Sequence, residues 1–155
     1  MVQARILALE SALRDVGVHE MPPGSNWGQR VAQYLRAAGI NSPAPWCAAF
    51  VTYHLRKVGY EVTTPNPASV ENWVVWARKH GDLVARPFRG DLVCYDWNAD
   101  NWYDHIGFVV RVLALRWKGK TFAGLVRTVE GNAEDAVRIK HRWIRHARFL
   151  RLPGW

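Results

Sequence analysis

The sequence has only two cysteines, Cys47 and Cys94, among 155 residues. It also lacks low-complexity segments, internal repeats and any run of roughly 20 apolar residues, the length that a helix needs to span a bilayer. Charges at Arg5, Glu10 and Arg14 interrupt residues 1–17, so no secretory signal peptide is expected. We therefore expect a protein made in the cytosol, with free thiols rather than a structural disulfide.

Metal-binding patterns are missing as well. The two cysteines do not show Cys-x-x-Cys spacing, and neither an HExxH motif nor an EF-hand loop occurs. We expect no metal and no other cofactor.

Positive charge is what the sequence has in excess. The 21 Lys and Arg residues against 13 Asp and Glu residues give a formal net charge of +8. This excess predicts a polyanionic partner, which charge alone cannot identify as nucleic acid, an envelope polymer or acidic lipid. Residues 138–148, RIKHRWIRHAR, interleave arginines with an aromatic residue as nucleic-acid-binding surfaces do. A basic binding module without catalysis is therefore the alternative to an enzyme.

Length and composition predict a single domain over residues 1–155, because a chain that is 49% hydrophobic and 22% charged can bury its own core. Nine tryptophans are many for this length. We expect most of them in the core or half-buried, and several near a cleft as a platform for a sugar or a peptide. They are spread along the chain at positions such as Trp27, Trp46, Trp73, Trp97, Trp102 and Trp143.

Helical periodicity marks the first half of the chain, and short apolar, β-branched runs mark the second half. Ser25 or Asn26 is expected to cap the second helix, and Ser69 the fourth. Helices followed by a mostly antiparallel sheet predict an α+β fold. The expected helices are 3–16, 31–38, 47–59 and 70–80, and the expected strands are 91–95, 105–113, 121–129, 136–143 and 147–152.

Cys47 stands where a helix is expected to begin, because Pro43 and Pro45 disfavour helix before it and suit a helix start. In the first turn, unpaired N–H groups and the positive end of the helix dipole favour an anion, and hence the nucleophilic thiolate. The alternative is a small buried apolar residue. The presence of a base decides between the two.

Among the six histidines, His105 best matches that base, because it opens an apolar strand. On its face of the strand, Gly107 has no side chain and would leave room for a substrate backbone. His54 lies seven residues after Cys47 on the same helix, about 10 Å along the axis, and cannot reach the thiol. A structural, hydrogen-bonded histidine is the alternative for His105. The residues expected on the core face of the strand are Ile106, Phe108, Val110 and Val112, and the histidines expected at the surface are His80, His141 and His146.

Glu130 and Asn132 are the candidates for orienting the base. They share one face of a strand if the backbone stays extended there, and either could accept the other ring N–H of His105. Asp104 is a weaker candidate, because it precedes His105 directly and points to the opposite face. Cys94 alternates within a short apolar strand and is expected to serve packing.

Four blocks carry a resemblance to a known family. They are PWCAAFV around Cys47, RGDLVCY over 89–95, DHIGFVV over 104–110 and VEGN over 129–132. In this order they resemble the CHAP amidohydrolase/peptidase domains of the NlpC-type, papain-like superfamily. The resemblance covers roughly residues 15–150, and the combination is specific where each block alone is weak. The lead-in HEMPPGSNWG, over 19–28, resembles that of phage and prophage members.

The chain departs from related sequences in three respects. It lacks the AspCysSer start of the NlpC branch and the aspartate cluster that binds calcium in some CHAP domains, and we expect no separate wall-binding domain.

The resemblance implies a papain-like α+β fold, with N-terminal helices packed on a C-terminal, mostly antiparallel sheet. It implies hydrolysis of an amide or peptide bond of bacterial peptidoglycan, by an N-acetylmuramoyl-L-alanine amidase or an endopeptidase. The implied catalytic residues are Cys47 as nucleophile, His105 as base, and Glu130 and Asn132 as the polar groups that follow the histidine. The residues that we expect to contact substrate are Trp46, Gly107, Ser25 and Asn26.

Such an enzyme is expected to act on the cell wall after release or export, as a bacteriophage endolysin, a tail-associated lysin or a secreted toxin domain. Peptidoglycan is its expected partner, and anionic envelope polymers are a further one. We expect no nucleic-acid partner, no membrane-spanning segment and a monomer.

Overall fold

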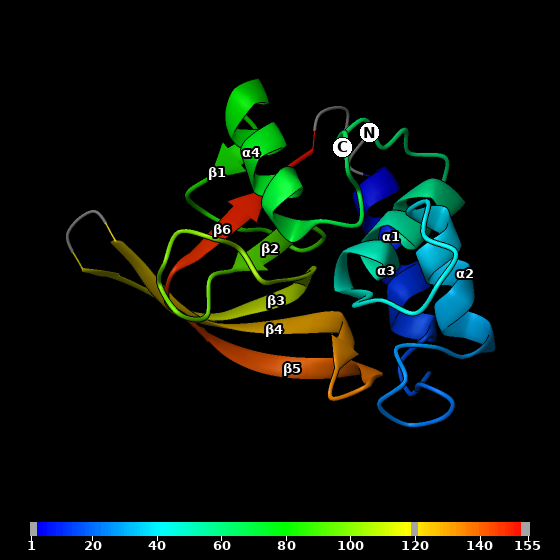
Figure 1. Cartoon of the computed structure of the whole chain (residues 1–155). Helices are drawn as coiled ribbons and strands as arrows, with labels where there is room; N and C mark the ends of the chain where they lie inside the picture. The colour runs from blue at the N-terminus through cyan, green and yellow to red at the C-terminus, as the bar shows by residue number, and fades with distance from the viewer. Residues whose placement is uncertain (1–2, 119–120, 153–155) are drawn as a thin grey trace.

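The computed structural model describes residues 3–118 and 121–152. Four helices come first and a six-stranded antiparallel sheet follows, which confirms the α+β prediction. Figure 1 shows α1, α2 and α3 together at one side of the sheet and α4 near β1 and β6. Within the described ranges, no helix has the length and apolar character needed to cross a membrane. The helices are α1 (Gln3–Arg14), α2 (Gln29–Ala37), α3 (Cys47–Lys57) and α4 (Val70–His80).

The strands lie in the order β1-β6-β2-β3-β4-β5, and every neighbouring pair is antiparallel. The β3–β4 hairpin extends several residues beyond the predicted strands. The part of β3 beyond its predicted end at residue 113 includes exposed Ala114 and Arg116, so it does not show the apolar run by which a strand is recognised. The strands are β1 (Leu83–Val84), β2 (Leu92–Tyr95), β3 (His105–Lys118), β4 (Thr121–Ala133), β5 (Ala136–Ile144) and β6 (Ala147–Leu150).

Local chemistry sets the ends of α3 and α4. The hydroxyl of Ser69 accepts a hydrogen bond from the backbone N–H of Asn72 (3.4 Å) and caps α4, as predicted. Gly81 ends α4 in the left-handed conformation, with φ at 77°. Helix α3 begins at Cys47, directly after the proline-containing segment, as predicted.

The loop between α1 and α2 does not supply the predicted side-chain cap of α2. The N-cap of α2 is Gly28, which has no side-chain capping bond, so neither Ser25 nor Asn26 caps this helix. Asn26 instead donates its backbone N–H to Oε2 of Glu20 (2.8 Å). The Ser25 hydroxyl lies 3.5 Å from the carbonyl oxygen of Trp27. The polar residues of the loop therefore stabilise the loop itself.

Apolar side chains form two clusters, one on each face of the sheet. The larger cluster joins the helices to the sheet and contains Phe108 and Val110 of β3, while Val109 belongs to the smaller one. A register shift between Val109 and Arg111 interrupts the alternation. Val112 therefore packs against the smaller cluster and not, as predicted, on the face of Phe108 and Val110.

Candidate active site

Cys47 is the first residue of α3, and its side chain is 7% exposed. Its thiol lies 4.0 Å from the carbonyl oxygen of Asp104, the residue that precedes His105. The helix packs on β3 and β4, so its N-terminus lies against the start of β3. The N–H groups of a first helical turn have no partner within the helix, and they would stabilise a negative charge beside Cys47.

Gly131 of β4 allows α3 to lie close to the sheet. A β-carbon on Gly131 would lie 2.5 Å from Cβ of Phe50 and 3.0 Å from the Trp46 ring. Trp46 is fully buried and donates its indole N–H to Oε1 of Glu20 (2.8 Å). The prediction that Trp46 contacts substrate is therefore wrong, because its ring belongs to the core beneath the start of α3.

His105 begins β3 and donates its Nε2–H to Oε2 of Glu130 in β4 (2.8 Å). Glu130 is fully buried and accepts further hydrogen bonds from the Thr128 hydroxyl (2.6 Å) and from the guanidinium of Arg142 (2.7 and 3.2 Å). Burial by itself would raise the pKa of Glu130. The hydrogen bonds from His105, Arg142 and Thr128 outweigh burial and lower this pKa to about 2.

The imidazole of His105 lies between Glu130 and Cys47. Burial disfavours its charged form, but hydrogen-bonding interactions with Cys47 and Glu130 outweigh burial and raise the pKa of His105 to about 9. Because Nε2 faces Glu130, Nδ1 is the ring nitrogen left for Cys47. The imidazole is thus protonated at neutral pH and places a positive charge beside Cys47.

Gly107 has a different role from the predicted one. A β-carbon on Gly107 would lie 2.6 Å from Cγ of Glu130 and 2.9 Å from the carbonyl oxygen of Val129. The space beside Gly107 is therefore filled by Glu130 and is not open to a substrate. Glu130 reaches His105 across this glycine, so the missing side chain permits the carboxylate–imidazole contact.

Gly107→Ala is expected to displace the Glu130 carboxylate and to lower the rate of hydrolysis about tenfold or more, because small misplacements of reacting groups are costly. Overpacking should also lower the free energy of unfolding by roughly 1–3 kcal/mol, which thermal unfolding would measure. If the loss of rate acts through Glu130, the same change in a Glu130→Gln background should add little. Additive losses would show that Gly107 acts independently of the carboxylate.

Asn132 lies outside the extended part of β4, because its φ is 54° and the register shifts between Glu130 and Ala133. The extended backbone that would place Asn132 on the face of Glu130 is therefore absent. In the amide orientation that its neighbours favour, Asn132 accepts the backbone N–H of Trp46 (3.2 Å) and donates to Oε1 of Glu20 (3.3 Å). Asn132 therefore hydrogen-bonds the residue before Cys47, whereas Glu130 hydrogen-bonds the imidazole of His105.

Sequence reasoning missed Glu20. This carboxylate is 1% exposed and joins the α1–α2 loop, Trp46 and Asn132 through its two oxygens. One acidic residue in a polar loop gives no signal in a single sequence. Its partners are identified only by the tertiary structure.

A cavity of ≈ 280 Å³ is lined by His105 and Asn132, together with Trp97 and Arg142. Trp97 is 52% exposed and stacks on the buried Tyr95 ring, with centroids 4.6 Å apart. Among the described residues that line this cavity, Trp97 is the one tryptophan, and its exposed ring suits the predicted platform. Ser25 and Asn26 are not among the described residues that line it.

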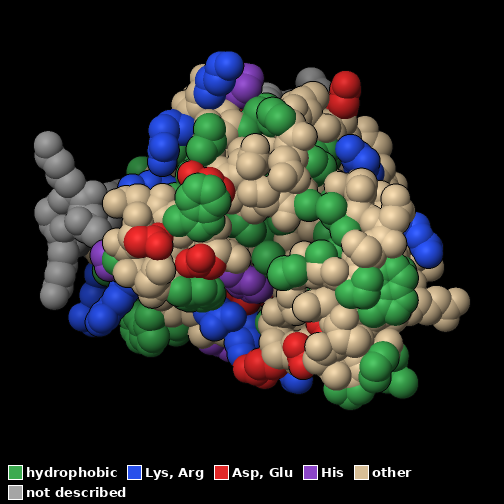
Figure 2. All heavy atoms as spheres, viewed as in Figure 1, with side chains coloured by type: hydrophobic (Ala, Val, Ile, Leu, Met, Phe, Trp, Pro, Cys, Tyr) green, Lys and Arg blue, Asp and Glu red, His purple; other side chains and the backbone are tan. Residues whose placement is uncertain are grey.

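The expected basic surface over 138–148 is largely engaged in ion pairs. Arg142 binds Glu130 (2.7 Å), while Arg138 and Lys140 both pair with Glu134 (3.3 and 2.8 Å). Figure 2 shows acidic and basic side chains interspersed over one face of the molecule. Arg142 also lies over the Trp97 ring (5.0 Å), so it belongs to the candidate active site rather than to a free basic strip.

The remaining candidate groups lie elsewhere. His54 is fully buried, with Nδ1 2.9 Å from the Ser11 hydroxyl and Nε2 3.3 Å from Asp15, and burial lowers its pKa. Cys94 is fully buried, and burial raises the pKa of its thiol. The described residues contain no group of three or more His, Cys, Asp or Glu side chains arranged to hold a metal ion.

The family model for the CHAP domain matches residues 39–132. This range covers more than half of the chain and includes Cys47, His105, Glu130 and Asn132. No curated protein matches the chain, and no solved structure matches it.

Proposed function

Since the chain belongs to the CHAP domain family, a family of amidase and peptidase hydrolases associated with peptidoglycan, we propose that it cleaves an amide or peptide bond of bacterial peptidoglycan. The observation that supports this proposal is the contact series Cys47, His105, Glu130, in which a thiol at a helix start lies beside an oriented imidazolium. A cysteine nucleophile, a base and an orienting carboxylate are the parts that thiol hydrolysis requires.

In the proposed reaction, the Cys47 thiolate attacks the scissile carbonyl carbon and forms the new C–S bond. N–H groups of the first turn of α3 hold the oxyanion that develops. The imidazolium of His105 then gives its proton to the leaving amine as the C–N bond breaks. Water deprotonated by His105 attacks the acyl-enzyme, which releases the carboxylate product and restores the thiolate.

The cavity beside His105 is the proposed site for the substrate next to the scissile bond. The exposed face of Trp97 offers apolar contact to a sugar ring or a peptide. Arg142 lines the same cavity, and we propose that its charge also favours the carboxylates of a stem peptide. The enzyme would act on the wall after release or export.

Analysis of the digestion products tests this function directly. Incubation with purified peptidoglycan should create new amino groups and new carboxyl groups in equal number. Sequencing the released peptides assigns the bond, since an amidase frees the amine attached to the lactyl group and an endopeptidase frees one within the stem. Prior treatment with iodoacetamide should block the reaction by alkylating Cys47. New reducing sugar ends without new amines would refute the proposal.

A further inference from the structure

A second and larger cavity, of ≈ 620 Å³, lies between the segment before β2 and the middle of β3. Four arginines line it, Arg86, Arg89, Arg111 and Arg127, and no carboxylate is among its described lining residues. It shares no described residue with the cavity at His105. Arg111 lies six residues beyond His105, roughly 20 Å along an extended strand, so this cavity is separate from the candidate active site.

Two of these arginines face each other on neighbouring strands. Arg111 of β3 is the direct cross-strand partner of Arg127 of β4, and His141 of β5 follows in the same row. Like charges placed directly opposite each other destabilise a sheet. Within the part of the chain that the structure describes, neither arginine makes an ion pair. A bound anion would remove this repulsion.

The acidic side chain nearest in sequence to Arg89 already pairs with other cations. Asp91, the carboxylate closest in sequence to Arg89, accepts hydrogen bonds from Arg151 (3.0 and 2.6 Å) and lies 3.2 Å from the guanidinium of Arg5. Its charge is thus already matched by two cations. No acidic side chain within residues 3–118 and 121–152 forms an ion pair with the arginines of the cavity.

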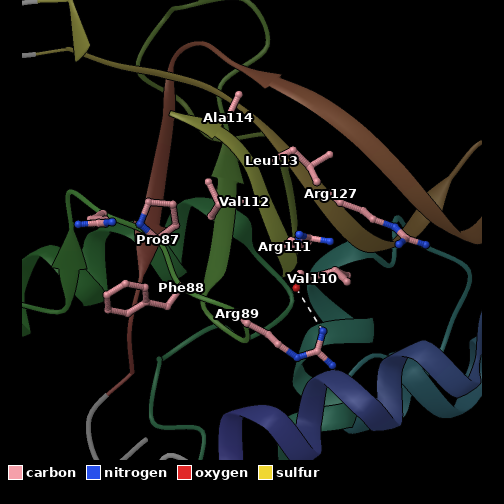
Figure 3. A pocket seen from close by; sticks show the side chains of 10 residues that line it. Pro87, Phe88, Arg89, Val110, Arg111, Val112, Leu113, Ala114 and Arg127 are labelled. Atoms are coloured by element: carbon pink, nitrogen blue, oxygen red, sulfur yellow. Dashed lines mark hydrogen bonds between the residues drawn. The ribbon is translucent and has the colours of Figure 1, made fainter. Parts of the chain in front are cut away.

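The cavity is also preorganised. Arg89 donates from its guanidinium to the carbonyl oxygen of Val110 (3.2 Å), which fixes this group at the cavity wall. Figure 3 shows the guanidinium groups of Arg89, Arg111 and Arg127 toward one side of the pocket, with Pro87 and Phe88 toward the other. The ligand would therefore meet a cationic wall and an apolar wall.

We propose that this cavity binds the phosphate groups of an aliphatic phosphodiester polymer. Guanidinium groups match phosphate oxygens in bidentate geometry, and several can share one phosphate. The volume is in the range of ligand pockets, and the apolar wall suits an aliphatic linker. Nucleic acid fits less well, because successive bases stack on several aromatic side chains. The described lining has one aromatic ring, the half-exposed Phe88, and the guanidinium of Arg151 lies over it at 4.4 Å.

Titration calorimetry with a synthetic poly(glycerol phosphate) hexamer tests the proposal without any catalytic step, so its result is independent of the hydrolytic function. The variant Arg111→Gln/Arg127→Gln should bind the hexamer about tenfold or more weakly, because each lost charge-assisted hydrogen bond is costly. The matched control, Arg36→Gln/Arg145→Gln, removes the same charge at exposed positions outside the cavity and should change affinity less than about twofold.

Two results would overturn the inference. Equal weakening in both double variants would show that the polymer responds only to net charge. Tighter binding of a single-stranded DNA hexamer or of phosphatidylglycerol vesicles than of the poly(glycerol phosphate) would assign the cavity to another partner. Circular dichroism of both variants should match the parent, because all four side chains are exposed. Turnover of a small soluble muropeptide is expected to stay unchanged.

Discussion

Replacement of Cys47 by alanine is expected to abolish hydrolysis of peptidoglycan while the fold is kept. In the proposed mechanism the thiolate forms the covalent bond to the substrate, and loss of a nucleophile lowers the rate on the order of 10⁴-fold or more. The side chain is small, so the free energy of unfolding should fall by only about 1 kcal/mol. Clearing of a purified wall suspension measures the first effect, and thermal unfolding measures the second.

Cys94→Ala is the matched control, because Cys94 is the other free thiol and is fully buried in the core. Burial raises the pKa of this thiol and keeps it uncharged. We expect activity close to that of the parent and a similar small loss of stability. A Cys47→Ala variant that clears walls as fast as the parent would show that Cys47 is not the nucleophile.

Glu130→Gln is expected to reduce the rate of hydrolysis by about 10²–10³-fold. The substitution keeps the shape of the side chain but removes the charge that orients His105 and stabilises its imidazolium. It also leaves Arg142 without its carboxylate partner. Asn132→Ala should cost less, since Asn132 binds the Trp46 backbone and Glu20 rather than His105. Equal and small losses of rate in the two variants would show that Glu130 does not orient His105.

The pH profile separates this role from a purely structural one. The parent should lose kcat/KM as pH rises through about 9, where His105 loses its proton. Glu130 contributes to that raised pKa, so Glu130→Gln should move the alkaline limb to lower pH, whereas Asn132→Ala should leave it in place. The stability contributed by protonated His105 is complete below its ordinary pKa of 6.5 and is lost as pH rises through about 9.

The positions of Cys47 and His105 could be predicted because each depends on local chemistry. Prolines mark the start of the Cys47 helix, and a β-branched apolar run marks the strand that His105 opens. The same reasoning gave the four helices and five of the six strands, apart from ends that shifted by a few residues. It missed the two-residue β1, which is too short to carry a pattern.

The contacts around these residues could not be predicted, because they depend on which strands become neighbours. Gly107 gives the same sequence signal whether a substrate or Glu130 fills the space beside it. In the sequence, Arg142 is one charge of a basic stretch. The β4–β5 register sets Arg138 opposite Glu130, yet the side chain of Arg142 is the one that reaches this carboxylate. The positive φ of Asn132 likewise follows from the irregular end of β4.

Three consecutive residues of β4 connect the parts of the candidate active site. Glu130 hydrogen-bonds the imidazole of His105, and Gly131 packs closely against the helix that begins at Cys47. Asn132 hydrogen-bonds the backbone of the residue before that cysteine. The proposed base, His105, and the proposed nucleophile, Cys47, therefore both contact one short piece of backbone, although they come from different layers of the fold. A thermal displacement of this end of β4 carries both groups in the same direction, so their separation varies less than the position of either group.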